Sequence, residues 1–184
     1  MNTIEQLYHI HHNTPSDINE HLPTLHKYAK LCDTVAEFGV RTVVSSYALA
    51  LARPQKLTCV DIENNAYVSN FIEQCKKENI NATFHQANTL TYELEEVDML
   101  FIDTLHSFSQ LTQELKLHAN KVKKYLLFHD TISFGSCNED DRQCGENCGL
   151  VPAIRNFLRE NSNWKELETH QNNNGLTVLH RVDT

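Results

Sequence analysis

Short apolar runs alternate with amphipathic stretches along the chain after residue 33. Within each run the apolar side chains follow one another with few polar interruptions, which is typical of strands buried on both faces of a parallel sheet. The stretches between the runs carry apolar residues three and four positions apart, the spacing of one helix face. The pattern predicts five buried strands, at residues 34–38, 57–60, 82–85, 98–102 and 125–128.

Helices are predicted between these strands, and a hairpin is predicted at the end of the chain. The helices run from just after Gly39 to Leu51 and over residues 67–77, 108–120 and 151–160. Residues 164–169 and 176–182 flank a polar N-N-N-G turn at 172–175, which indicates two antiparallel strands.

The first 31 residues also have a helical pattern, which a polar segment at residues 13–17 divides in two. Thr14 or Ser16 is the predicted N-cap of the second helix. A hydroxyl at that position can accept a hydrogen bond from the first helical turn.

This alternation predicts an α/β fold: a Rossmann-like, doubly wound, mostly parallel sheet with a C-terminal antiparallel hairpin and two extra N-terminal helices. We expect residues 1–33 to form a helical extension and residues 34–184 a Rossmann-like domain, the two making a single compact domain. A helical pair packed on a sheet edge often makes the contact between two copies of a chain, so a homodimer is also expected.

Composition excludes some classes of function. Sixteen Lys and Arg against 24 Asp and Glu leave a formal net charge of -8, whereas nucleic-acid binding draws on clustered positive charge. No apolar run approaches the roughly 20 residues of a bilayer-spanning helix, and the N-terminus lacks the pattern of a secretory signal. We therefore expect a cytoplasmic protein that binds neither nucleic acid nor membranes.

The six cysteines fall into two groups. Those in patterned segments are expected to be small buried side chains: Cys32, Cys59 and Cys75. Those in one polar loop lack the paired spacing of structural zinc: Cys137, Cys144 and Cys148. Reduced thiols in a mobile lid are the interpretation that a cytoplasmic compartment favours.

Polar residues and a glycine stand at the carboxyl ends of the predicted parallel strands, where ligands bind in open sheets of this kind. These residues are Glu37, Gly39, Asp61, Asn88, Asp103, His129 and Asp130. Gly39 lets backbone approach a ligand, and Asp61 follows about twenty residues later, where a ribose-binding carboxylate is expected. The pair favours a nucleoside-containing cofactor, although the chain has neither G-x-G-x-x-G nor a P-loop motif.

Carboxylates and imidazoles follow the two predicted strands 98–102 and 125–128. Asp103 and His106 come after the first of them, and His129 with Asp130 ends the second. Such a group can hold a hard divalent cation, or it can orient and deprotonate a hydroxyl. Five other histidines are scattered and are expected on the surface: His9, His11, His12, His21 and His26.

Four segments at these strand ends carry a family resemblance. They read E-F-G-V-R-T-V-V-S at 37–45, V-D-I-E at 60–63, D-M-L-F-I-D-T-L-H at 98–106 and K-V-K-K-Y-L-L-F-H-D-T at 121–131. Over about residues 34 to 182 the sequence resembles the class I S-adenosylmethionine-dependent methyltransferases. It is most similar to the small metal-assisted O-methyltransferases typified by catechol and macrolide-sugar O-methyltransferases, and also to the cephalosporin-hydroxylase-like group.

The resemblance implies a methyltransferase-like Rossmann domain that uses S-adenosylmethionine. The residues at the family's cofactor-binding positions are Glu37, Gly39, Ser45, Asp61 and Asn88. Those at its metal-ligand positions, for Mg²⁺ or another divalent cation, are Asp103, His129 and Asp130. The residues expected to act on the acceptor hydroxyl are Asp103 and His106.

Three features depart from the family pattern. Val43 replaces the second glycine of the first motif, residues 121–124 replace a glycine turn, and one metal position is a histidine. The leading hypothesis is a methyltransferase acting on a hydroxyl of a small molecule or sugar. The alternatives are a metal-dependent hydrolase or oxygenase that uses the Asp/His cluster, and a non-catalytic binding module that kept the fold.

Overall fold

The computed structural model of this chain describes residues 2–140 and 148–182. Its strands, in chain order, are β1 (Thr34–Phe38), β2 (Lys56–Asp61), β3 (Ala82–Gln86), β4 (Val97–Ile102), β5 (Val122–His129), β6 (Trp164–His170) and β7 (Leu176–Arg181). Its helices are α1 (Ile4–Asn13), α2 (Leu22–Ala29), α3 (Val44–Leu51), α4 (Ala66–Lys77), α5 (Phe108–His118) and α6 (Leu150–Glu160), with short 3₁₀ turns η1 (Asn19–His21) and η2 (Ala119–Lys121).

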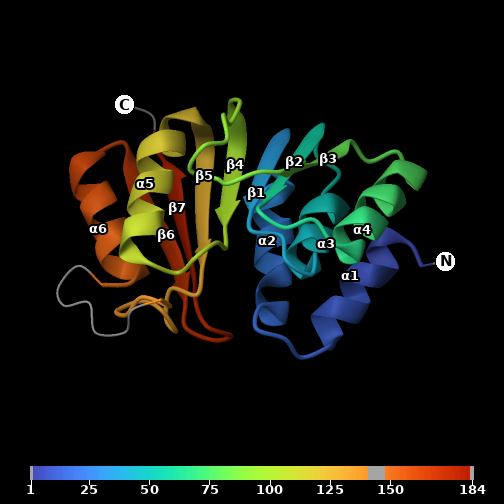
Figure 1. Cartoon of the computed structure of the whole chain (residues 1–184), viewed down its shortest axis with the longest axis horizontal. Coiled ribbons are helices and arrows are strands. Elements are labelled where there is room, and N and C mark those ends of the chain that lie inside the picture. Colours follow the sequence, from blue (N-terminus) through green and yellow to red (C-terminus); the bar gives the residue numbers. More distant parts are fainter. Residues whose placement is uncertain (1, 141–147, 183–184) are drawn as a thin grey trace.

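The seven described strands form one sheet in the order β3-β2-β1-β4-β5-β7-β6 (Figure 1). β1 to β5 pair in parallel, and β7 and β6 add two antiparallel strands at one edge. The predicted fold class is therefore confirmed, including the terminal hairpin and the two helices that precede β1.

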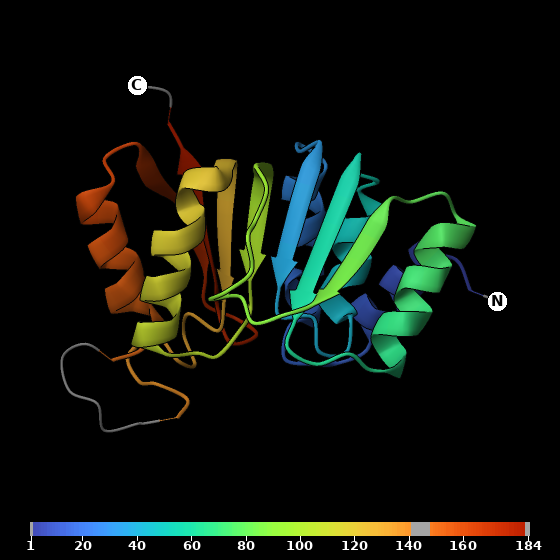
Figure 2. The same cartoon turned by 45° about the horizontal axis from the view of Figure 1, so that its top comes forward.

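Alternate residues of the central strands enter two separate cores, one on each face of the sheet. In β4, Met99 and Phe101 pack with the helices α1 to α4, whereas Leu100 and Ile102 pack with α5 and α6. Figure 2 shows α5 and α6 on the near side of the sheet, toward the edge that carries β7 and β6, with the N-terminal helices behind the sheet. Burial on both faces explains why these strands have continuous rather than alternating apolar sequence.

The predicted N-cap of the second helix is wrong. Thr14 is the C-cap of α1, and the Ser16 hydroxyl accepts a hydrogen bond from the Asn19 N–H (3.1 Å), ahead of η1 rather than α2. Within residues 2–140 and 148–182 no side chain caps the start of α2, and a proline lies in its first turn. Proline has no backbone N–H, so one of the groups that a cap would satisfy is missing there.

The cysteines agree only in part with expectation. The buried, unpaired thiols are the predicted ones: Cys32, Cys59 and Cys75. Cys137 is also unpaired, but Cys148 is disulfide-bonded, so the expectation of reduced thiols is wrong for it. Whether a cysteine forms a disulfide depends on which sulfur atoms the fold brings together, and the expected cellular compartment does not determine this. Cys144 lies outside the described residues.

Within residues 2–140 and 148–182, no helix has both the length and the apolarity needed to cross a bilayer.

Gly39 lies where the chain leaves β1, against the end of β4. It has a φ of +85°, and a Cβ atom placed on it would lie 1.9 Å from the carbonyl oxygen of Asp103. The Asp103 N–H in turn donates to the Phe38 carbonyl (2.8 Å). No side chain fits between these two backbone segments, so the position requires glycine.

Replacing Gly39 by alanine is expected to lower the free energy of unfolding by about 3 kcal/mol, since positive φ strain and backbone overlap add together. The matched control is Asn79→Ala at an exposed position with φ +55°, which tests the φ strain alone and should cost about 1 kcal/mol. Chemical denaturation followed by circular dichroism measures both. Equal losses would contradict the steric argument.

Candidate functional site

A cavity of about 610 Å³ lies at the carboxyl ends of the parallel strands. The predicted site residues that line it are Gly39, Ser45, Asp61, Asn88, Asp103 and His106. Three others, Glu37, His129 and Asp130, are buried and do not line it. The structure therefore brings the predicted residues to one place, in two layers around one cavity.

Asp61, at the end of β2, holds the loop that follows Gly39. Its Oδ2 accepts hydrogen bonds from the N–H groups of Val40 (2.7 Å) and Arg41 (3.0 Å), and its Oδ1 accepts one from Glu63 (2.9 Å). A carboxylate has about four acceptor positions, so Asp61 shapes the loop and keeps acceptor capacity for a ligand.

Asn88, which follows β3, forms its own turn at the cavity wall. Its Oδ1 accepts a hydrogen bond from the Leu90 N–H (2.9 Å), and its carbonyl accepts from Thr91 and Tyr92 (2.9 Å each). This turn faces the same cavity as Asp61.

Glu37 lies beneath α3 and contacts the cavity only through a neighbour. Its two carboxyl oxygens accept hydrogen bonds from the hydroxyls of Ser45 (2.5 Å) and Ser46 (2.6 Å). Burial raises the pKa of Glu37 to about 7, against the opposing effect of bonds from Ser45, Ser46 and Cys59. The Ser45 hydroxyl uses its hydrogen in the bond to Glu37. The Ser45 oxygen at the cavity wall can therefore only accept a hydrogen bond from a ligand.

Val43 occupies the position where the resemblance places a second glycine. It has a φ of +62°, which is strained for a β-branched residue. Its side chain is buried in the core shared with α3 and does not line the cavity. A left-handed backbone at this position gives a physical reason for glycine in the motif.

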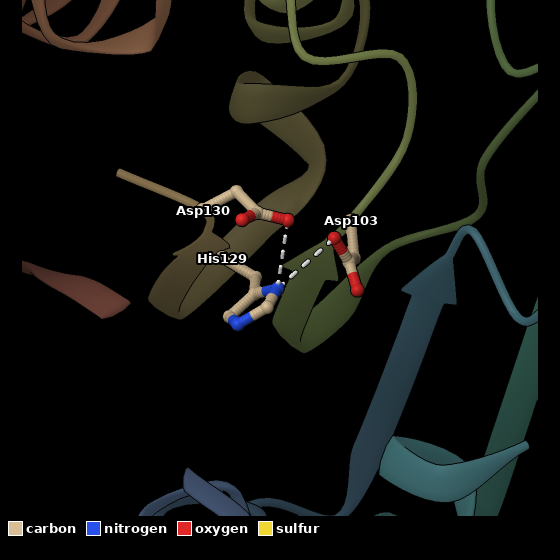
Figure 3. Close-up of side chains that lie close together, drawn as sticks. All are labelled: Asp103, His129 and Asp130. Atoms are coloured by element: carbon tan, nitrogen blue, oxygen red, sulfur yellow. Dashed lines mark hydrogen bonds and ion pairs between the residues drawn. The ribbon is translucent and has the colours of Figure 1, made fainter. Parts of the chain in front are cut away.

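Asp103, His129 and Asp130 meet where β4 and β5 end (Figure 3). His129 Nδ1 lies 3.3 Å from Asp103 Oδ1 and 3.2 Å from Asp130 Oδ2. Burial raises the pKa of the Asp103 carboxyl, but hydrogen bonds from His106 and His129 outweigh it and hold that pKa well below its usual range. Likewise, burial lowers the pKa of His129, but its bonds to Asp103 and Asp130 raise it to about 10.

These three side chains fit a divalent cation. One ligand atom from each lies within 4.8 Å of the others, and two carboxylates with one imidazole make a common donor set. Asp130 Oδ1 is buried and has no hydrogen-bond partner among the described residues. An orphaned buried carboxylate oxygen is costly unless a ligand or ion satisfies it.

His106 lies on the cavity side of this cluster. Its Nε2 is 3.1 Å from both Asp103 Oδ1 and Asp130 Oδ2, and its Nδ1 is 2.9 Å from Glu139 Oε2. Burial lowers the pKa of His106, but the hydrogen bond to Asp103 and the charges of Asp130 and Glu139 raise it overall. The ring also stacks on Phe134, with centroids 4.9 Å apart.

Sequence reasoning missed Glu139 and Phe134, which both come from the loop after β5. Neither has a motif around it, and only their polar-loop context could have drawn attention to them. It also missed an ion pair at the cavity rim, where Arg41 lies 3.0 Å from Asp17 of the N-terminal segment. Contacts between segments distant in sequence connect all of these residues to the site.

His21 corrects another prediction, since it is buried rather than on the surface. Its Nε2 donates to the carbonyls of Asn172 (3.0 Å) and Asn173 (3.1 Å). Its ring lies 5.7 Å from that of His129. The sequence around His21 gives no sign that the N-terminal segment packs against the turn between β6 and β7. Of the other four, His9 is exposed and His11, His12 and His26 are partly buried.

No family model matches this chain, and no curated protein matches it either. Solved structures do resemble it. The N-methyltransferase NodS from Bradyrhizobium japonicum, in complex with S-adenosyl-L-homocysteine, has a TM-score of 0.64 at 13% identity, over 99% of this chain and 100% of that one.

Two further structures are similar over most of their length. The methyltransferase PaMTH1 from Podospora anserina, bound to S-adenosylhomocysteine, has a TM-score of 0.66 at 14% identity, over 100% of this chain and 89% of that one. The O-methyltransferase TomG from Streptomyces achromogenes, in complex with S-adenosylmethionine, has a TM-score of 0.61 at 16% identity, over 92% and 82%. The chain therefore has the Rossmann-like methyltransferase fold that the sequence resemblance implied.

Glu37 makes stability depend on pH. Because its pKa is raised from 4.5 to about 7 on folding, the folded state binds more protons than the unfolded state between these values. Stability is therefore lost as pH rises through that window, by about 3 kcal/mol at most. Glu37→Gln removes the effect, so its stability relative to wild type should rise with pH up to about 7 and then level off.

Denaturant unfolding of both proteins at several pH values measures this difference. Ser46→Ala is the matched variant, because it keeps Glu37 but removes a hydrogen bond that favours the carboxylate, and it should move the transition to higher pH. A difference between wild type and Glu37→Gln that does not change with pH would contradict the raised pKa.

Proposed function

We propose that this protein is an S-adenosylmethionine-dependent methyltransferase that methylates a hydroxyl of a small molecule or sugar with the help of a divalent cation. The observation that carries the proposal is the cavity at the strand ends. It is lined by Gly39 and Asp61, which suit a nucleoside, and by Asp103, which belongs to the cation-binding cluster. The likeness in fold to methyltransferases supports it.

The cofactor would lie along the edge formed by β1, β2 and β3. Because Gly39 has no side chain, the cofactor can approach the backbone there closely. The acceptor positions that remain on Asp61 suit the ribose hydroxyls of the cofactor. The Ser45 hydroxyl donates its hydrogen bond to Glu37, so its oxygen is an acceptor that suits the ammonium group of the cofactor's methionine portion. Asn88, which follows β3, lines the same cavity.

The cation would be held by Asp103, His129 and Asp130. Mg²⁺ prefers oxygen ligands, whereas an imidazole ligand also suits Mn²⁺, Fe²⁺ and Zn²⁺. We therefore include these ions with Mg²⁺ among the candidates.

When bound, S-adenosylmethionine supplies the methyl group on a sulfonium, and the cation lowers the pKa of the acceptor hydroxyl. The protein's own part is to orient the two reactants and to take up one proton. Asp103 and His106 both line the cavity, and His106 Nε2 lies 3.1 Å from Asp103 Oδ1. Of the two, His106 in its neutral form suits the role of proton acceptor, because the pKa of the Asp103 carboxyl is held well below its usual range. The stacking of Phe134 and the contact with Glu139 keep the His106 ring in this orientation.

Calorimetric titration with S-adenosylhomocysteine tests the cofactor. We expect dissociation constants on the order of micromolar, and Asp61→Asn should weaken binding by about ten- to a hundredfold, since a charged hydrogen-bond acceptor is lost. Asparagine keeps one oxygen for the loop N–H groups. Glu73→Gln makes the same charge change on α4, at an ion pair with Lys77 that does not line the cavity, and should bind like wild type.

Absence of binding with and without Mg²⁺ or Mn²⁺ would contradict the methyltransferase proposal. Tight cation binding without any response to S-adenosylhomocysteine would favour a metal-dependent hydrolase or oxygenase. Binding of neither would favour a non-catalytic module that kept the fold.

Asp103→Ala tests the cation cluster separately from the cofactor. It should weaken Mn²⁺ binding at least tenfold and abolish transfer to any acceptor that wild type methylates, while S-adenosylhomocysteine affinity stays within a few fold. Alanine keeps the backbone contacts with Gly39 and Phe38, and Asp103→Asn provides a second variant of the same shape. Glu96→Ala, at the opposite end of β4, is the control. Normal transfer by Asp103→Ala would show that the assigned site is wrong.

A further inference from the structure

The turn between β6 and β7 joins three parts of the molecule that are far apart in sequence. Asn173 and Asn174 have φ values of +44° and +70°, and Gly175 follows at +95°. The Asn174 carbonyl accepts hydrogen bonds from the N–H groups of Ile132 (2.9 Å) and Ser133 (3.1 Å), just after β5. The turn is thus bound to the segment that follows the cation cluster.

The Asn173 side chain binds the same turn to the N-terminal segment. Its Nδ2 donates to the Ser16 carbonyl (2.7 Å), and its Oδ1 accepts from the Glu20 N–H (3.0 Å). Both ends of the amide are used, so the side chain determines where the Asn173 backbone lies. Asparagine is also one of the few residues that adopts a positive φ readily.

The Asn173 carbonyl lies 3.2 Å from His129 Nε2. A carbonyl oxygen can only accept, so His129 must carry a proton on Nε2. The other nitrogen, Nδ1, is then the one that faces Asp103 and Asp130. In the metal-free protein Nδ1 also carries a proton, which it donates to these carboxylates. Loss of that proton to solvent leaves on Nδ1 the lone pair that binds a metal ion.

We infer that Asn173 is a positioning residue for His129. Held by Ser16 and Glu20, its carbonyl keeps a proton on Nε2 and aims Nδ1 into the cation cluster. The N-terminal segment is in this way part of the support of the candidate cation site, although none of its residues is a ligand. This inference rests on the proposed function for the cation itself, but not for the orientation of the ring.

Asn173→Gly tests the inference, because glycine adopts the positive φ but removes both side-chain hydrogen bonds. The probe is Mn²⁺ alone, titrated into the full chain by electron paramagnetic resonance. Affinity should fall about tenfold or more, as for other residues that orient metal ligands. Asn172→Ala is the matched control. Asn172 lies in the same turn as Asn173, and this variant loses the hydrogen bond from the Asn172 side chain to Glu20. The Asn173 carbonyl stays on His129, so Mn²⁺ affinity should stay within twofold of wild type.

A second measurement separates positioning from general loosening of the structure. In the metal-free protein, the Nε2 proton of His129 should exchange slowly with water when observed by ¹⁵N NMR, since it is buried and hydrogen-bonded. Asn173→Gly should speed up this exchange markedly, and Asn172→Ala should not. Thermal unfolding of all three proteins checks that the variants fold.

Equal Mn²⁺ affinity and equal proton exchange in wild type and Asn173→Gly would overturn the inference while leaving the cation site standing. If wild type binds no divalent cation, the metal-assisted part of the proposed function fails. The exchange measurement then decides the inference alone: faster exchange in Asn173→Gly supports it, and unchanged exchange overturns it.

Discussion

The contact between the end of β1 and the end of β4 is the constraint on which the site depends. The chain runs outward from β1 to β3 and then returns to place β4 on the other side of β1, so strand order reverses between these two strands. In open sheets a ligand crevice forms at such a reversal. Here the backbone of Gly39 lies against the carbonyl of Asp103. The loop that suits a cofactor and the first residue of the cation cluster are therefore adjacent, and a side chain at position 39 would push them apart.

Buried charge in the site is arranged in two separate groups. Glu37 is held by two serine hydroxyls under α3, where burial keeps its pKa near neutrality. Asp103 and Asp130 both contact His106 and His129, and hydrogen bonds from the two histidines hold the pKa of the Asp103 carboxyl well below its usual range. Burying a carboxylate costs free energy unless hydrogen bonds or opposite charges compensate. Serine hydroxyls do this for Glu37, and histidines do it for Asp103 and Asp130. The Asp130 oxygen that has no hydrogen-bond partner among the described residues is the exception, and it is the feature that points most directly to an ion.

Segments outside the sheet complete the site from two directions. The loop after β5 brings Phe134 and Glu139 onto His106. From the other side, the N-terminal segment and the β6–β7 turn surround His129 with His21 and Asn173. The strand ends alone supply the chemical groups, but their orientation depends on these contacts. Orientation matters because positioning and charge, rather than covalent chemistry, dominate a methyl transfer of the proposed kind.

The sequence by itself determined the fold class, the positions of the seven strands in the described part of the chain to within a few residues, and the polar strand ends. Continuous apolar runs and glycine turns are local signals, and they carry over directly to a sheet buried on both faces. Tertiary structure alone decided which of those polar groups line the cavity and which lie behind it, such as Glu37. It also decided the burial of His21, the disulfide at Cys148 and the roles of Glu139 and Asn173. Apart from the disulfide, these features depend on contacts between residues 8 to 157 positions apart in the chain, and no local pattern records which distant segments meet.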